Sequence, residues 1–401
     1  MFEGQKAGRG SRLRRVLALA VLTLAAGAVT AAALWPRPDP MALLDQASRE
    51  FTLGRLDRAG ALLDRRARWT APGALDWILR ARIAEGRDRP DEALGHLKRV
   101  SDSDPFAAQR WLLEGQIQLN RDRARAAEGA LRRASALDPG LTIAHRELAY
   151  VYAMQHRQNE ADAEFRALAG TPAADYKVAF LWCQNACDIW DPRETGARLA
   201  KFLAADPDDR ASRVALALSR RLDGLPDEAE ALLAPLDPTD MDARALRAEI
   251  ALDRGDTPVA ERLAAEGPAD HAPSNILRGR LDLGRRDANA AARAFRAALA
   301  AVPDSRDALH GIGQALRLRG DHEDAEVYLR QARRRDALRR LILDSREKLT
   351  TDSSLFSRLA AACESVPLPR QAALFYHLAV GVDPLDAASQ QALARLARSP
   401  P

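Results

Sequence analysis

A small residue recurs at a nearly constant interval along most of this 401-residue chain. Most steps are 34 residues long, with two steps of 31 and one of 47. The marker residues are Ala59, Ala93, Ala127, Ala161, Thr195, Ala229, Ala260, Ala291, Ala325 and Ala372. A large apolar residue follows nearly every marker four positions later, as Leu63, Leu131 and Phe295 do. Single coincidences are common in an alanine-rich chain, but a shared phase of small and large residues predicts a structural repeat.

The segment around Ala127 indicates what one repeat forms. Two amphipathic helices are predicted at 109–119 and 123–137, joined by a polar turn. Gly115 and Ala127 are small enough to let the two helices approach closely, and Leu131 fills the seam between them. Because so small a pair cannot bury its apolar face alone, it needs a stacked neighbour on each side. The sequence therefore predicts an all-α solenoid.

The repeat resembles the tetratricopeptide repeat (TPR) family over roughly residues 43–385. The segments that resemble it most are those marked by Ala93, Ala127, Ala161, Ala291 and Ala325. The pattern is weaker at Thr195, which replaces the small alanine, and at Ala260, where the second helix is short. The resemblance implies a right-handed α-solenoid of about ten TPR-like helix-turn-helix repeats. It also implies a protein that binds other proteins through a concave groove.

The positive charge of the chain is concentrated at its N-terminus. Residues 1–15 contain five basic residues and one acidic residue, so they carry the whole formal net charge of +4. Residues 16–401 are therefore balanced between acidic and basic side chains. Because phosphate binding needs a concentrated positive surface, this balance argues against nucleic acid as a partner.

An uncharged run at residues 16–35 follows this basic tail. Its 20 residues are enough to span a bilayer core of about 30 Å. The preceding positive charge predicts that residues 1–15 stay in the cytoplasm and that the solenoid lies outside it. We therefore expect a single-pass protein of a bacterial cytoplasmic membrane, with the proline-rich residues 36–42 as a linker. Two alternatives are a signal peptide cleaved near Ala31-Ala32-Ala33 and a buried apolar helix of a cytoplasmic protein.

Three segments depart from the regular repeat. The fifth repeat, residues 176–206, contains Trp182 and Trp190, and it either packs irregularly or presents a binding feature. An inserted helix is predicted near residues 336–349. Residues 386–401 are predicted to form a polar, terminal capping helix and tail.

Two of the three cysteines lie one helical turn apart, at Cys183 and Cys187. They are either a redox pair or half of a metal site, or simply two small residues of the repeat core. Cys183 occupies the position that is small in the other repeats, and no histidine lies nearby in sequence, so the core interpretation is favoured.

The sequence carries no motif for catalysis. It has no glycine-rich phosphate loop, no paired-histidine zinc motif and no haem-attachment motif. We therefore expect no enzyme activity and no catalytic, cofactor-binding or metal-binding residues.

A binding role is the remaining prediction. The exposed positions of the first helices are expected to line a peptide-binding groove formed by Arg82, Gln116, Arg146, Tyr150, Lys177, Phe180, Gln184, Arg221, Arg280 and Arg317. Their mixture of arginine and apolar side chains suits a peptide with acidic character. We expect a membrane-anchored scaffold for envelope or secretion-complex proteins. The alternatives are a soluble periplasmic or secreted adaptor and a non-catalytic subunit of an envelope enzyme.

Overall fold

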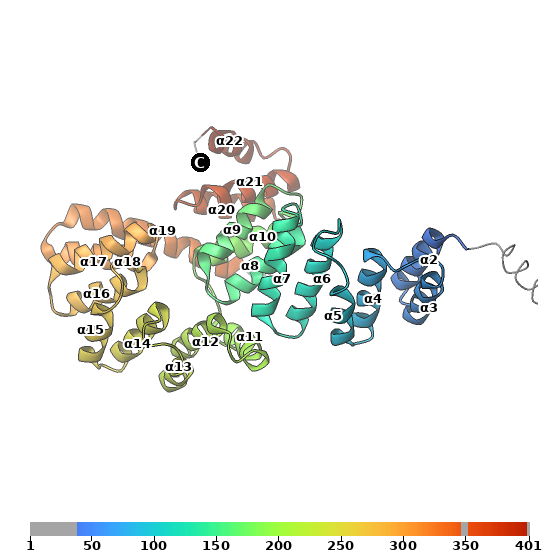
Figure 1. Cartoon of the computed structure of the whole chain (residues 1–401). Helices are drawn as coiled ribbons and strands as arrows, with labels where there is room; N and C mark the ends of the chain where they lie inside the picture. The colour runs from blue at the N-terminus through green and yellow to red at the C-terminus, as the bar shows by residue number, and fades with distance from the viewer. Residues whose placement is uncertain (1–37, 346–351, 399–401) are drawn as a thin grey trace, which may run out of the picture. The chain divides into compact units, whose positions relative to one another are not determined.

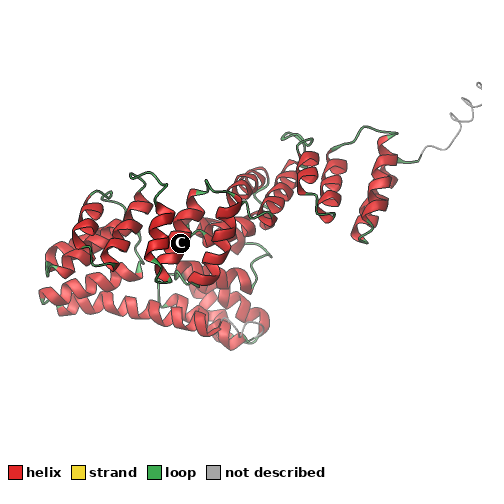
Figure 2. Cartoon of the chain, turned by 90° about the horizontal axis from the view of Figure 1, so that it is seen from below, coloured by secondary structure: helices red, strands yellow, loops and turns green. Residues whose placement is uncertain are grey.

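The computed structural model describes residues 38–345 and 352–398, which are helical and contain no strand (Figures 1 and 2). The chain divides between Ser101 and Asp102 into two compact units. The first unit contains α2 (Pro40–Thr52), α3 (Leu56–Ala67), α4 (Ala74–Gly86) and α5 (Pro90–Leu97). The helices pair as α2 with α3 and α4 with α5, as the repeat predicts.

A linker was predicted at 36–42, but helix α2 already begins at Pro40, within that range. Asp39 caps this helix by accepting a hydrogen bond from the backbone N–H of Met41 at 2.9 Å. Proline fits the first position of a helix, where its missing N–H has no partner to lose. A buried ion pair at 2.5 Å between Arg66 and Asp76 joins α3 to the start of α4.

The second unit contains the remaining helices. They are α6 (Ala107–Asn120), α7 (Ala124–Leu137), α8 (Thr142–Met154), α9 (Gln158–Ala169), α10 (Tyr176–Ala186), α11 (Pro192–Ala205), α12 (Arg210–Leu222), α13 (Pro226–Leu233), α14 (Met241–Asp253), α15 (Thr257–Ala265), α16 (Ala272–Gly284), α17 (Ala288–Ala301), α18 (Arg306–Arg319), α19 (His322–Ser345), α20 (Ser353–Glu364), α21 (Pro369–Val382) and α22 (Ala387–Leu396). Consecutive helices pack in pairs, except for α10 and α11. All ten marker residues are fully or almost fully buried, so the recurring small residue marks the seam of each pair.

In nine of the ten repeats, the turn between the two helices holds one residue in the left-handed backbone region. These residues are Gly54, Asp88, Asp122, His156, Asp188, Gly224, Gly255, Arg286 and Gly320. Asp122 precedes the marker Ala127 by five residues. The same spacing is found in all the repeats of this series except the fifth. In the fifth repeat, Asp188 precedes Thr195 by seven residues. The turn of this repeat is therefore two residues longer than the others.

The longer turn separates the two helices of the fifth repeat. α10 packs against α9, α19 and α21, whereas α11 packs against α8 and α12. Within the two described ranges, α10 and α11 make almost no contact with each other. Asp191 starts α11 by accepting hydrogen bonds from the backbone N–H groups of Arg193 and Glu194 at 2.9 and 3.1 Å. α11 thus takes the place beside α8 that the first helix of a regular repeat would occupy.

Helices far apart in sequence meet at α10. Figure 1 shows α20 and α21 beside α9 and α10, and α10 packs directly against α21. Arg339 of α19 donates hydrogen bonds to the backbone carbonyls of Cys187 and Asp188, at the C-terminal end of α10. One continuous apolar cluster includes Phe180 of α10 and Phe356 of α20. This contact closes the second unit on itself.

No helix in residues 38–345 and 352–398 is long and apolar enough to cross a membrane. The longest, α19, has 24 residues, but it carries a run of charged residues that includes Arg333, Arg334 and Arg335. The predicted location in a bacterial cytoplasmic membrane, with the solenoid outside the cytoplasm, is therefore contradicted. The predicted tail at 1–15 and the predicted membrane helix at 16–35 lie outside the described residues.

Candidate functional site

The separation of α10 from α11 opens a groove in the second unit. Its volume is about 700 Å³, and it is lined by α8, α10, α11 and the loop between α10 and α11. The size falls within the range of pockets that bind ligands in proteins. The groove exists because the fifth repeat has a longer turn, so the irregular segment of the sequence is also the segment that forms the cavity.

The floor of the groove is apolar. Phe165 and Leu168 of α9 are buried beneath it, and Tyr150 and Leu181 extend into it with 36% and 39% of their surface exposed. Trp190 closes one side, and its ring packs edge-on against His156 with 6.4 Å between ring centres. A partner's apolar side chain placed on this floor would be stabilised by about 1.5–3 kcal/mol when fully buried.

The indole N–H of Trp190 is an unsatisfied donor beside this floor. Its nitrogen is buried, and it has no hydrogen-bond partner among the residues that the structure describes. Leaving a buried donor unpaired costs about 1–3 kcal/mol.

The rim carries equal numbers of basic and acidic side chains, which are Arg146, Lys177, Arg198, Lys201, Glu147, Asp175, Asp191 and Glu194. Several of these charges already have partners inside the protein. Arg198 forms an ion pair with Asp122 at 2.7 Å. Asp175 caps α10 by accepting a hydrogen bond from the backbone N–H of Val178 at 3.0 Å.

Lys177 and Lys201 are the rim cations without a partner. Both are exposed, and neither makes a hydrogen bond or ion pair within residues 38–345 and 352–398. Lysine is rare in this arginine-rich chain, occurring only at 6, 98, 177, 201 and 348. Two free ammonium groups therefore border an apolar floor, and they favour a ligand with negative charge.

Glu147 and Arg146 of α8 both line the groove. Partial burial raises the pKa of the Glu147 carboxyl, and the charge of Arg146 opposes this effect. Arg146 itself donates a hydrogen bond to the backbone carbonyl of Ala173 at 3.2 Å.

The structure brings together four of the ten residues predicted to bind a peptide. Arg146, Tyr150, Lys177 and Gln184 line the groove. Phe180 was expected to line the groove from the exposed face of its helix, but only 5% of its surface is accessible. Phe180 belongs instead to the apolar cluster that joins α10 to α20 and α21. That placement corrects the prediction, because α10 is displaced from the row of first helices.

The other predicted residues do not line this groove. Arg82 lies on α4 in the first unit, where its side chain is exposed. Gln116 is half-buried on α6. Arg221 of α12 forms ion pairs with neighbouring carboxylates, and Arg280 and Arg317 are exposed on α16 and α18. A role for these five in binding stays a prediction.

Sequence reasoning missed Leu181 and Lys201 as groove residues. Leu181 directly follows Phe180 on α10. Because α10 is displaced, Phe180 is buried and Leu181 is exposed to the groove. Lys201 lies on α11, a second helix, which a regular repeat would keep away from the groove. The signal that could have identified both residues is the two-residue lengthening of the turn before Thr195.

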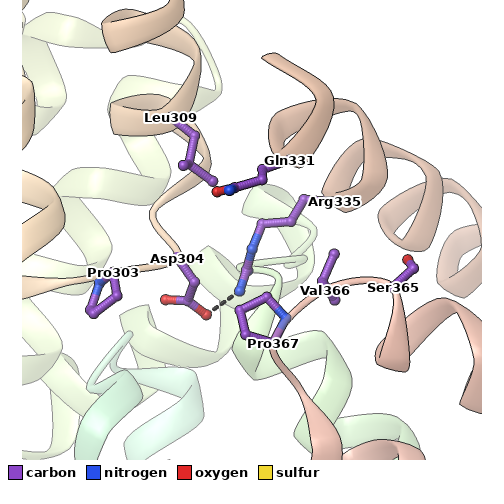
Figure 3. A pocket seen from close by; sticks show the side chains of 8 residues that line it. All are labelled: Pro303, Asp304, Leu309, Gln331, Arg335, Ser365, Val366 and Pro367. Carbon is purple, nitrogen blue, oxygen red and sulfur yellow. Dashed lines mark hydrogen bonds and ion pairs between the residues drawn. The ribbon is translucent and has the colours of Figure 1, made fainter. Parts of the chain in front are cut away.

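A second cavity, of only about 30 Å³, lies between the middle of α19, the loop before α18 and the loop between α20 and α21 (Figure 3). Arg335 points into it and pairs with Asp304, and it also donates a hydrogen bond to the backbone carbonyl of Ala186 at 3.1 Å. The cavity is large enough for a water molecule but not for a ligand. Its residues therefore hold helices together. No cluster of metal-binding side chains occurs in the described part of the chain.

The stacked helix pairs define the described chain as an α-solenoid of TPR-like repeats. No family model matches the sequence, and no curated protein matches it. Among solved structures, the Cut9–Hcn1 hetero-tetramer of APC/C is similar, with 14% identity over 89% of this chain and 90% of that chain, at a TM-score of 0.37. A tetratricopeptide repeat protein from Parabacteroides merdae is 15% identical over 69% of this chain and 98% of that chain, at a TM-score of 0.33.

A thermophilic TPR protein of Thermus thermophilus is also similar. It is 20% identical over 45% of this chain and 98% of that chain, at a TM-score of 0.32. These TM-scores are low, so the function proposed below rests on the residues of this chain.

Proposed function

We propose that this protein is a non-enzymatic scaffold that binds a short peptide segment of a partner protein in the groove between α8, α10 and α11. The observation that supports this proposal is the combination of an apolar floor with Lys177 and Lys201, two cations that have no partner in the described chain. A solenoid groove of this kind accepts an extended or helical segment.

The chemistry of the groove defines the segment. One large apolar side chain would rest on Tyr150 and Leu181, where half-exposed apolar surface would be removed from water. One or two carboxylates would lie against Lys177 and Lys201. An acidic segment with an aromatic or aliphatic anchor meets both requirements.

A display library of random short peptides provides the test. Peptides selected on the full chain should be enriched in Asp and Glu next to a large apolar residue. Their affinity should fall as salt is added, because the charge pairs at this exposed rim are screened. Selection of no peptide, or of basic peptides, would contradict the proposal.

Charge reversal then locates the site. The double variant Lys177→Glu with Lys201→Glu should weaken a selected peptide by about 10-fold, since each exposed pair contributes up to about 1 kcal/mol and reversal adds repulsion. Lys98→Glu reverses one charge at an exposed lysine that does not line the groove, and it should leave the affinity unchanged. An equal loss of affinity in the double variant and in Lys98→Glu would show a general effect of charge and would contradict binding at the groove.

The apolar floor is tested separately. Leu181→Ala should weaken the binding of the same peptides, because it removes apolar surface from the floor of the groove. Leu318→Ala alters an exposed leucine of α18 and should not change the binding. Circular dichroism of each variant checks that the fold is retained. A peptide that binds all the groove variants as well as the parent binds elsewhere on the protein.

A further inference from the structure

The sulfur atoms of Cys183 and Cys363 lie 3.3 Å apart, although the two residues are 180 positions apart in the sequence. Cys183 belongs to α10 and Cys363 to α20, and both are completely buried. The chain has only three cysteines, and two of the three meet in an apolar cluster where helices distant in sequence contact each other. The repeat pattern does not account for this contact, because it relates only neighbouring helices.

The surrounding structure holds the two sulfur atoms in place. Phe180 and Phe375 belong to the same apolar cluster as the two cysteines. Arg335 and Arg339 of α19 bond to the backbone carbonyls at the C-terminal end of α10. A disulfide has an S–S distance of about 2.05 Å, so the sulfur atoms need to approach by about 1.3 Å to form one. Side-chain rotation within a packed contact supplies a movement of this size.

We propose that Cys183 and Cys363 form a disulfide that fastens α10 to α20. The oxidant is a disulfide of the glutathione class. One thiolate of the pair attacks it and releases the first small thiol, and the other thiolate then attacks the mixed disulfide and releases the second. One S–S bond breaks and one forms, the two cysteines lose two electrons and two protons, and the oxidant is reduced to two thiols.

Cys187 is not expected to replace either partner. It lies one turn from Cys183, at the C-terminal end of α10, and no contact with Cys363 as close as that of Cys183 is present. Burial raises the pKa of its thiol to about 12, and it raises that of Cys183 well above the ordinary value. Because thiolates are scarce in the folded state, oxidation of the folded chain should be slow and oxidation during refolding should be faster.

The cross-link would act on two properties of the protein. It closes the chain between residues 183 and 363 into a loop, which restricts the unfolded state and stabilises the fold. It also fixes α10, whose Leu181 and Gln184 line the groove described above. The disulfide itself does not depend on whether the groove binds a peptide.

Refolding of the full chain in oxidised and reduced glutathione tests the proposal. Remaining thiols are alkylated in denaturant, and peptide mapping by mass spectrometry identifies any linked pair. We expect one free thiol, at Cys187, and a mass lower by two hydrogens. A chain with three alkylated thiols, with glutathione adducts alone, or with a link to Cys187 would overturn the proposal.

Alanine variants provide the matched comparison. Cys183 lies in an apolar cluster, and alanine is smaller than cysteine and adds no polar group there, so Cys183→Ala should fold. Added reductant should lower the urea midpoint of the parent and of Cys187→Ala. It should leave the midpoint of Cys183→Ala and of Cys363→Ala unchanged. A reductant effect that persists in those two variants would also overturn the proposal, whether or not peptides bind the groove.

Discussion

At the scale of single residues, close contact between helices depends on glycine at Gly115. A Cβ atom placed there would lie 2.6 Å from Cγ of Leu131 and 2.7 Å from its Cδ2. We expect Gly115→Ala to lower the free energy of unfolding by about 1–3 kcal/mol, because the added methyl group overpacks the seam of α6 and α7. Urea denaturation of purified variants measures this change.

Gly129 on the facing helix is the matched control. No atom lies within 4 Å of a Cβ placed there, and its backbone is helical. Gly129→Ala should therefore raise the free energy of unfolding by about 0.5–1 kcal/mol, since alanine loses less conformational entropy in a helix. Equal effects of the two substitutions would contradict the packing explanation. The Gly115–Leu131 contact could be predicted from the sequence, because both residues belong to one regular pair.

Asp242 makes part of the stability depend on pH. A hydrogen bond from His271 and another from Arg210 lower the pKa of its carboxyl to about 2, against the opposing effect of partial burial. The pKa in the unfolded chain is about 3.9, so the folded state binds fewer protons between these values. The stabilising contribution is therefore complete above about pH 4 and is lost as the pH falls towards 2.

Substitution of Asp242 tests this dependence. Asp242→Asn should lower the free energy of unfolding at pH 7 by up to about 1 kcal/mol, a small effect because the side chain is 46% exposed. The difference from the parent should shrink between pH 4 and pH 2 in urea titrations. A difference that does not change with pH would show that the carboxylate charge is not its cause.

At the scale of helices, the sequence predicts regular pairs well and irregular ones poorly. The repeat rule places the ten markers at the seams, and these positions are buried. The same rule misplaced Phe180, because it assumed that every turn has the same length. Asp188 and Thr195 are seven residues apart instead of five, and this difference moves α10 out of the row. The groove forms at that displacement, so a regular pattern could not reveal all of its residues.

The assumption of regular repeats also gave the wrong helix boundaries at α19. A separate inserted helix was predicted near 336–349, but one helix of 24 residues runs from His322 to Ser345. The segment contains no proline or glycine, and Leu338 and Ile342 continue the buried stripe that begins at Ala325. The continuous apolar stripe could have predicted one helix. Its contact with α10 could not have been predicted, because it joins residues about 150 positions apart.

At the scale of the whole molecule, that contact makes the second unit differ from a simple linear array. In a solenoid with neighbour contacts alone, stability is a sum of local terms, and removing one end affects only the adjacent repeats. Here α10 lies in one apolar cluster with α20 and α21. We expect the second unit to transmit a change at its C-terminal end to the middle of the chain.

Deletion of residues 352–401 tests this coupling. The deletion exposes Phe180 and Cys183 of α10, which now pack against the C-terminal helices. Loss of even one such side chain's burial, about 1.5–3 kcal/mol, should speed amide hydrogen exchange in α10 by about 10-fold or more. α14 is the control, because its apolar clusters contain no residue beyond 352, and its exchange should stay the same. Unchanged exchange in α10 would mean that its stability comes from neighbouring repeats alone, and faster exchange in both helices would indicate general loss of the fold.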